Sequence, residues 1–238
     1  MGRTAHCPYR VYSVVDMCGR YLISATPEAI AARFGLATAP DLSPRWNVAP
    51  SQNVPTIRSS RQGARTLSMM QWGLIPHWAK DPSIGQRLIN ARSETAAEKA
   101  SFRTPLKSHR CLIVTDGFYE WQRTDQGKQP WCIRAVDDVP FGLAALWSCW
   151  RGGDAPVETC TILTTTPNAT VKPIHNRMPV IVSPEDYNLW LDPLNTDVGS
   201  LQNVLAPAAD DLLHAFPVSR HVNRPVNDDP ACITPIDL

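Results

Sequence analysis

The sequence contains no C-x-x-C pair, and its seven cysteines and six histidines show none of the spacings typical of structural zinc sites. We therefore predict no metal and no cofactor. No internal repeat, low-complexity tract or linker interrupts the 238 residues, which favours a single domain. An odd number of cysteines without a secretory signal is typical of a reducing compartment, so we expect a cytoplasmic protein.

Long apolar segments are also missing. The longest, Phe141–Trp150, is too short to span a bilayer, so we expect no membrane contact. The net charge is also small, at +1, but the charged residues are distributed unevenly along the chain. Residues 1–125 hold 16 Lys and Arg against 9 Asp and Glu, whereas residues 126–238 hold 7 against 13. A basic half suits contact with phosphates, although chance asymmetry of a solvated surface remains the alternative.

Twenty-two scattered prolines predict many short elements instead of long helices. One helix should begin at Pro27, with Thr26 as its N-cap and Gly35 as its stop. Further helices are expected over Glu94–Phe102, from Ser183 onward, and near Leu201–Leu205. The expected strands are Gly19–Ser24, Val54–Arg58, Ala64–Trp72, Arg110–Thr115, Phe118–Trp121, Trp131–Val136, Phe141–Trp150, Glu158–Thr166, Val180–Val182 and His214–Ser219. The tail after Arg220 is expected to be irregular.

Cys18 directly follows a methionine. If translation begins at Met17 and that methionine is trimmed, Cys18 carries a thiol and an α-amine on adjacent carbons. Such a 1,2-aminothiol condenses with an aldehyde to an imine and then closes a thiazolidine ring. The alternative is that Cys18 is a small buried apolar residue, as free cysteine commonly is.

Two tryptophans, Trp72 and Trp78, lie close in sequence to basic residues. Aromatic rings beside cations are typical of single-stranded nucleic-acid binding, although tryptophan is also a common core residue. Asn90 and Arg92 precede the helix expected from Glu94, where helix N-termini favour anions. For Asn90 the alternative is a cap or turn residue.

Two further residues could transfer protons. Glu120 lies among three aromatic residues, so its carboxylate is either exposed to solvent or buried with a raised pKa suited to proton transfer. His175 stands in a proline-bounded loop before a strand, a usual place for a functional residue, and it could equally be a structural histidine.

Six motifs in order resemble the SOS-response-associated peptidase (SRAP) family. They are Met17–Tyr21, Trp46–Pro50, Trp72–Pro76, Ile89–Glu94, Gly117–Trp121 and His175–Pro179. The resemblance implies an α+β fold, namely a compact single domain around a twisted, barrel-like antiparallel sheet with short flanking helices. It also implies covalent, reversible capture of abasic sites in single-stranded DNA during the SOS response, by a monomer without an obligate protein partner.

The resemblance further implies roles for individual residues. Cys18 would be the nucleophile through nitrogen and sulfur, Asn90 would hold the amine, Glu120 would move its protons, and His175 would promote sugar ring opening. Arg20, Arg45, Arg92 and Arg177 would bind phosphates. Trp72 or Trp78 would stack on bases, and Asn47 is counted with the DNA-binding residues. The protein would associate with the nucleoid when bound to DNA.

One departure from the family concerns the start of the chain. Sixteen residues precede Met17, and while they remain attached Cys18 has an amide nitrogen that cannot form a thiazolidine. We expect residues 1–16 to be an extension absent from the mature protein and residues 17–238 to be the domain. The alternative function is a cysteine peptidase of N-terminal-nucleophile type that removes residues 1–17 itself. A non-covalent DNA-binding module is the third possibility.

Overall fold

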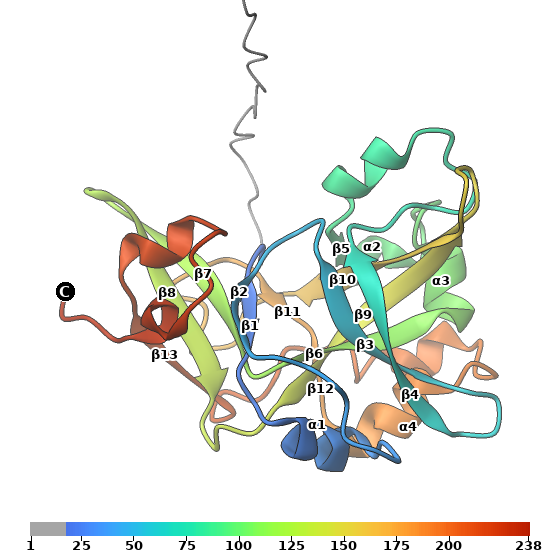
Figure 1. Ribbon diagram of the computed structural model, residues 1–238, viewed down its shortest axis with the longest axis horizontal. Helices are drawn as coiled ribbons and strands as arrows, with labels where there is room; N and C mark the ends of the chain where they lie inside the picture. Colours follow the sequence, from blue (N-terminus) through green and yellow to red (C-terminus); the bar gives the residue numbers. More distant parts are fainter. Residues whose placement is uncertain (1–17) are drawn as a thin grey trace, which may run out of the picture.

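Five strands close into a barrel in this computed structural model, which describes residues 18–238 (Figure 1). The strands are β3 (Asn53–Ser59), β4 (Arg65–Trp72), β6 (Arg110–Thr115), β9 (Phe141–Trp150) and β10 (Val157–Thr165). Each pairs with the next in the order β4-β3-β6-β9-β10, and β10 also pairs with β4. The expected extension, residues 1–16, lies outside the described residues.

A second sheet of five strands lies beside the barrel, in the order β13-β8-β7-β1-β2 (Figure 1). Its strands are β1 (Tyr21–Ile23), β2 (Arg45–Val48), β7 (Gly117–Thr124), β8 (Gly127–Ala135) and β13 (Leu213–Pro217). Only Asp116 separates β6 of the barrel from β7 of this sheet. Strand β1 pairs with β7, with Tyr21 opposite Phe118, and this pairing sets the start of the domain against the strand that carries Glu120.

Short elements complete the fold. The remaining strands are β5 (Asn90–Arg92), β11 (Met178–Pro179) and β12 (Ile181–Val182). The α-helices are α1 (Pro27–Phe34), α2 (Ser93–Ala96), α3 (Arg103–Ser108) and α4 (Tyr187–Leu191). The 3-10 helices are η1 (Pro82–Arg87), η2 (Pro184–Asp186), η3 (Val198–Leu201), η4 (Arg220–Asn223) and η5 (Pro230–Ile233). No helix in residues 18–238 is long and apolar enough to cross a membrane.

The prediction of an α+β domain around a barrel-like sheet is confirmed, with one difference. The barrel is mixed instead of antiparallel, because β10 runs parallel to both β4 and β5. Helix α1 forms as its caps predict: the Thr26 hydroxyl accepts a hydrogen bond from the N–H of Ala29, and Gly35 adopts a left-handed conformation with φ of 64°.

The helix expected over Glu94–Phe102 was wrong. Helix α2 ends at Ala96, turns follow, and α3 begins at Arg103. Pro105 lies in the first turn of α3, where its missing N–H costs no helical hydrogen bond, so a new helix begins there. The buried side chains of Ala96 and Phe102 attach the two short helices separately to the core.

A loop between β4 and β5 folds tightly onto itself. Gly73 has a φ of 128°, and a Cβ atom added to it would lie 2.7 Å from the carbonyl oxygen of Gly85. Only glycine fits both the conformation and the contact. The N–H of Leu74 donates to the carbonyl of Leu88, so the loop returns to the barrel immediately before Asn90.

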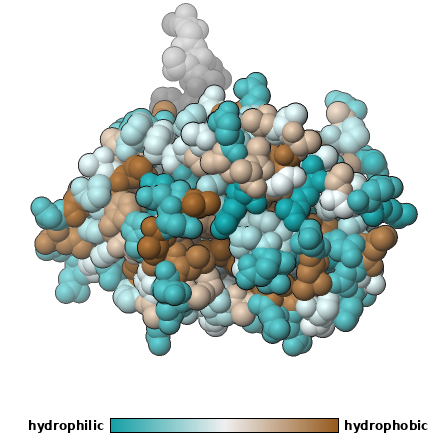
Figure 2. All heavy atoms as spheres, turned by 90° about the horizontal axis from the view of Figure 1, so that it is seen from below, coloured by the Kyte–Doolittle hydropathy of each residue, from teal (hydrophilic) through white to brown (hydrophobic). Residues whose placement is uncertain are grey.

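One face of the molecule is hollowed. Seen from below, it shows apolar residues around a central hollow (Figure 2). A cavity of about 270 Å³ lies among residues that include Phe141, Ile181, Val182, Leu212 and Arg33. None of the four predicted catalytic residues lines this cavity.

Candidate functional site

Cys18 lies three residues before the start of β1 and is only 1% exposed. Its carbonyl oxygen accepts a hydrogen bond of 2.9 Å from Nδ2 of Asn90, and its thiol faces the carbonyl oxygen of Arg20 at 3.9 Å. Burial, and secondarily the negative charge of Glu120, raises the pKa of the Cys18 thiol well above its ordinary value. The sulfur is therefore held as a neutral thiol near neutral pH.

Glu120, on β7, is 3% exposed. Burial raises the pKa of its carboxyl to about 8, although the backbone N–H groups of Trp121 and Cys18 oppose this rise. A carboxyl with a pKa near neutrality can both accept and return a proton. The backbone N–H of Cys18 is one of the donors that act on this carboxyl, so the carboxyl lies beside that nitrogen.

His175 stands in the loop between β10 and β11. Its Nδ1 atom lies 3.9 Å from Oε2 of Glu120, and 3.2 Å and 3.1 Å from the backbone nitrogen and oxygen of Arg177. The side chain of His175 is 15% exposed, against 4% for Glu120. The imidazole is therefore the more accessible member of this acid–base pair.

Two buried acceptors in the site have no donor. Within residues 18–238, neither Oδ1 of Asn90 nor Oε1 of Glu120 accepts a hydrogen bond. Leaving a buried acceptor unpaired is costly, so such atoms call for an explanation. Both residues act on Cys18, and an N-terminal ammonium there would bring donors that an amide nitrogen lacks.

The four predicted catalytic residues converge from separate elements. Pairing of β1 with β7 brings Cys18 to Glu120, and parallel pairing of β5 with β10 places Asn90 beside Ile162. His175 follows β10 in the chain. The structure thus brings Cys18, Asn90, Glu120 and His175 together, while their chemical roles stay predictions.

The residues predicted to bind DNA differ in accessibility. Trp78 is 51% exposed and Arg92 is exposed, so both are free to meet a nucleic acid. Arg45 forms an ion pair with Asp228 and donates to Oε1 of Gln52 at 2.8 Å. Contact of Arg45 with a phosphate stays a prediction. A phosphate would have to share the guanidinium with Asp228 and Gln52.

Two predicted DNA contacts are wrong because the side chains are fully buried. Trp72 is 0% exposed, and its indole N–H donates to the carbonyl of Ile89 at 2.8 Å. Its ring packs against Tyr21 and cannot stack on a base. Asn47 is also 0% exposed, and its Nδ2 lies within 3.0 Å of three backbone carbonyl oxygens.

Those three carbonyls belong to the C-terminal segment, defined here as residues 219–233. They are the carbonyls of Val222, Arg224 and Asn227. Arg20 joins the same network, since its Nη1 lies 3.0 Å from both Oδ1 of Asn47 and the Val222 carbonyl. Arg20 therefore holds the chain after Cys18 against the C-terminal segment, and its contact with phosphate stays a prediction.

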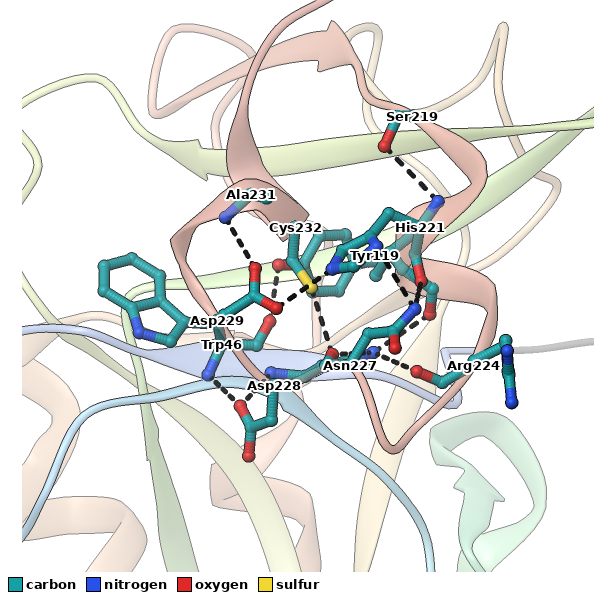
Figure 3. A network of polar contacts seen from close by, with 12 residues as sticks. Trp46, Tyr119, Ser219, His221, Arg224, Asn227, Asp228, Asp229, Ala231 and Cys232 are labelled. Carbon is teal, nitrogen blue, oxygen red and sulfur yellow. Dashed lines mark hydrogen bonds and ion pairs between the residues drawn. The ribbon is translucent and has the colours of Figure 1, made fainter.

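The C-terminal segment, which was expected to be irregular, contains two 3-10 helices, η4 and η5. Asp228 accepts from the backbone N–H groups of Trp46 and Asn47, and His221 Nε2 lies 3.0 Å from Oδ2 of Asp229 (Figure 3). His221, Asp229 and Cys232 hold their ligand-type atoms within 4.8 Å of one another, and hydrogen bonds already engage all three side chains. The signal that could have revealed η5 is Asp229 before Pro230, an N-cap followed by proline.

These observations define a buried cysteine with an amide, a carboxyl and an imidazole around it, at the junction of a barrel and a second sheet. The family model described as SOS response associated peptidase (SRAP) matches residues 17–225. The chain belongs to this family, as its motifs predicted. The match begins at the residue before Cys18.

Individual proteins extend the comparison. The abasic site processing protein YoqW of Bacillus subtilis (strain 168) is 44% identical over 222 residues, which cover 91% of this chain and 99% of that protein. The abasic site processing protein HMCES of Gallus gallus is 34% identical over 228 residues, covering 82% of this chain and 67% of that protein. A crystal structure of a Bacteroides thetaiotaomicron protein superposes with a TM-score of 0.82 at 27% identity, covering 92% of this chain and 100% of that one.

Proposed function

We propose that this protein processes abasic sites in DNA by capturing them covalently through Cys18. Membership of the SRAP family and the names of the similar abasic site processing proteins support this function. The observation that carries the chemistry is the contact of Asn90 and Glu120 with Cys18, together with their two acceptors that lack donors. Such a site accommodates an N-terminal amine.

The proposed reaction joins one aldehyde to one aminothiol and releases one water. The α-amine of Cys18 adds to the aldehyde carbon of the ring-opened sugar, and loss of water gives an imine. The thiol then adds across the imine, with its proton passing to nitrogen, and closes a thiazolidine. Because burial keeps the sulfur protonated, the amine attacks first and the thiol second.

Two groups divide the proton transfers in this proposal. Glu120, with a pKa of about 8, accepts the proton of the attacking amine. His175 is more accessible, and it donates to the departing hydroxyl and assists ring opening. Reversal uses the same groups in the opposite sense.

The proposal requires a free α-amine at Cys18. We propose that translation from Met17 followed by removal of that methionine supplies it, and that residues 1–16 are absent from the mature protein. Mass spectrometry of the protein from its natural source tests this. A terminus at Cys18 is the expected result, and a terminus within residues 1–16 would contradict it.

A second candidate is cleavage of the Met17–Cys18 peptide bond by the chain itself. The neighbouring thiol of Cys18 and carboxyl of Glu120, together with the family description as a peptidase, favour this possibility. Incubation of the purified full chain, followed by mass spectrometry, tests it. Release of residues 1–17 from the wild type but not from Cys18→Ser would support autocleavage, and an intact wild-type chain would exclude it.

The proposed partner is single-stranded DNA that contains an abasic site. Trp78 and Arg92 support this because both are exposed. A filter-binding titration compares single-stranded with duplex oligonucleotides, each with one abasic site. Faster capture of the single strand is expected, and equal rates would contradict the preference.

A further inference from the structure

Arg177 and Glu94 form a bidentate ion pair next to the candidate site. Nη1 of Arg177 lies 2.6 Å from Oε1 of Glu94, and Nη2 lies 2.8 Å from Oε2. The same Nη2 donates to the carbonyl of Thr164 on β10 at 2.6 Å. The Arg177 side chain is 13% exposed and that of Glu94 is 46% exposed. A bidentate pair of this kind fixes both the position and the orientation of the guanidinium.

This ion pair joins the segments of two predicted catalytic residues. Glu94 lies in α2, which directly follows the Asn90 strand β5. Arg177 follows His175 by two residues, and its backbone nitrogen and oxygen both lie within 3.2 Å of Nδ1 of the imidazole. The ion pair therefore fixes the backbone that holds the His175 ring.

The other side of the same loop is held independently. Nε2 of Gln122, on β7, donates to the carbonyl of Pro173 at 3.1 Å, and Oε1 of Gln122 accepts from the indole N–H of Trp131. The loop that carries His175 is thus attached to the Glu120 strand before the histidine and to Glu94 after it. Of these two attachments within the described residues, only the one through Glu94 uses a carboxylate.

We propose that Glu94 is a positioning residue, which acts through Arg177 to hold His175 against Glu120. The inference rests on the proposed function for its catalytic consequence. Ion pairs with a half-exposed partner contribute little to folding stability, so the role of Glu94 should appear in the crosslinking rate instead of the melting temperature. The competing explanation is that Glu94 only competes with DNA phosphates for Arg177.

Substitutions at Glu94 separate these explanations. Glu94→Gln removes the charge at nearly constant shape, and Glu94→Asp keeps it. Glu98→Gln is the matched control, because Glu98 is exposed, lies one turn further along and forms no ion pair among residues 18–238. Each variant, with its terminus at Cys18, is mixed with an excess of single-stranded DNA carrying one abasic site, and the rate of crosslinking is followed against DNA concentration.

We expect Glu94→Gln to lower the saturating rate constant at least tenfold, while the half-saturating DNA concentration changes less than twofold. Glu94→Asp should recover part of the rate, and Glu98→Gln should match the wild type. A wild-type rate for Glu94→Gln with tighter DNA binding would overturn the inference in favour of competition. Equal losses in Glu94→Gln and Glu98→Gln would also overturn it.

A second measurement does not depend on crosslinking. The His175 ring resonances of the full chain are recorded by NMR at one pH in the wild type, in Glu94→Gln and in Glu98→Gln. A shift of the His175 ring resonances in Glu94→Gln but not in Glu98→Gln is expected, and unchanged ring resonances in Glu94→Gln would overturn the inference. If the wild type fails to crosslink at all, the proposed function fails, whereas the NMR result still decides whether Glu94 positions His175.

Discussion

Nδ1 of His175 lies 3.9 Å from Oε2 of Glu120, although one residue belongs to a loop after the barrel and the other to a strand of the second sheet. The carboxyl is almost fully buried and the imidazole is partly accessible. This arrangement puts a proton acceptor beside the Cys18 nitrogen and a proton donor nearer to solvent.

Glu120 should make stability depend on pH. Burial raises its pKa from 4.5 to about 8, so the folded state binds this proton more tightly than the unfolded state. Its favourable contribution is complete below about pH 4.5 and is lost as the pH rises through about 8. Each unit of this shift corresponds to about 1.4 kcal/mol.

Urea denaturation of the full chain at about pH 5 and about pH 9 measures this effect. The wild type should lose more unfolding free energy between these pH values than Glu120→Gln, which cannot titrate at this position. Buried groups that do not interact with Glu120 contribute equally to both proteins and cancel in the difference. An identical pH dependence in the two proteins would show that the pKa of Glu120 is not raised.

Asn90→Ala should weaken both the fold and the reaction. It removes the only side-chain donor to the Cys18 carbonyl among the described residues and leaves that acceptor buried. The free energy of unfolding should fall by about 1–3 kcal/mol. Crosslinking by the folded protein should slow at least tenfold. A destabilised variant that crosslinks at the wild-type rate would restrict Asn90 to a structural role.

Asn47→Ala should destabilise the protein without changing DNA affinity. The substitution leaves carbonyls of the C-terminal segment without their buried donor, and we expect a loss of about 2–4 kcal/mol. Chemical denaturation measures the loss, and fluorescence anisotropy with undamaged single-stranded DNA measures affinity. Weaker DNA binding at unchanged stability would instead restore Asn47 to the DNA interface.

The two tryptophans should respond in opposite ways. Trp78→Ala removes an exposed ring and should weaken single-stranded DNA binding by about 1–3 kcal/mol at unchanged melting temperature. Trp72→Phe removes a buried indole hydrogen bond and should lower the melting temperature at unchanged DNA affinity. The reverse pattern, read by anisotropy and calorimetry, would contradict the placement of these rings.

Local signals predicted much of the fold. Caps defined α1, and apolar runs defined β6 and β9 to the residue. The parallel pairing of β10 with β4 and β5 could not be predicted, because it joins segments distant in sequence and no local pattern specifies strand direction. The helix expected from Glu94 failed because burial of Ala96 and Phe102 outweighed helix propensity.

The candidate site was predicted unevenly for the same reason. Cys18, Asn90, Glu120 and His175 were chosen from motifs, and the fold brings them together. The solvent exposure of Trp72 and Asn47 could not be predicted from the sequence, because a tryptophan or an asparagine in a motif can face either the core or a ligand. The pair of Glu94 with Arg177 joins distant segments and has no local signature.

The central claim is that Cys18 must carry a free α-amine to capture an abasic site. Protein that begins at Cys18 is mixed with single-stranded DNA containing one abasic site, beside Cys18→Ser and undamaged DNA, and analysed on a denaturing gel. We predict a heat-stable, slower band only for intact Cys18 with abasic DNA, and no band for the full chain whose terminus remains at Met1. A band of equal intensity from the full chain that begins at Met1, or no band in any lane, would contradict it.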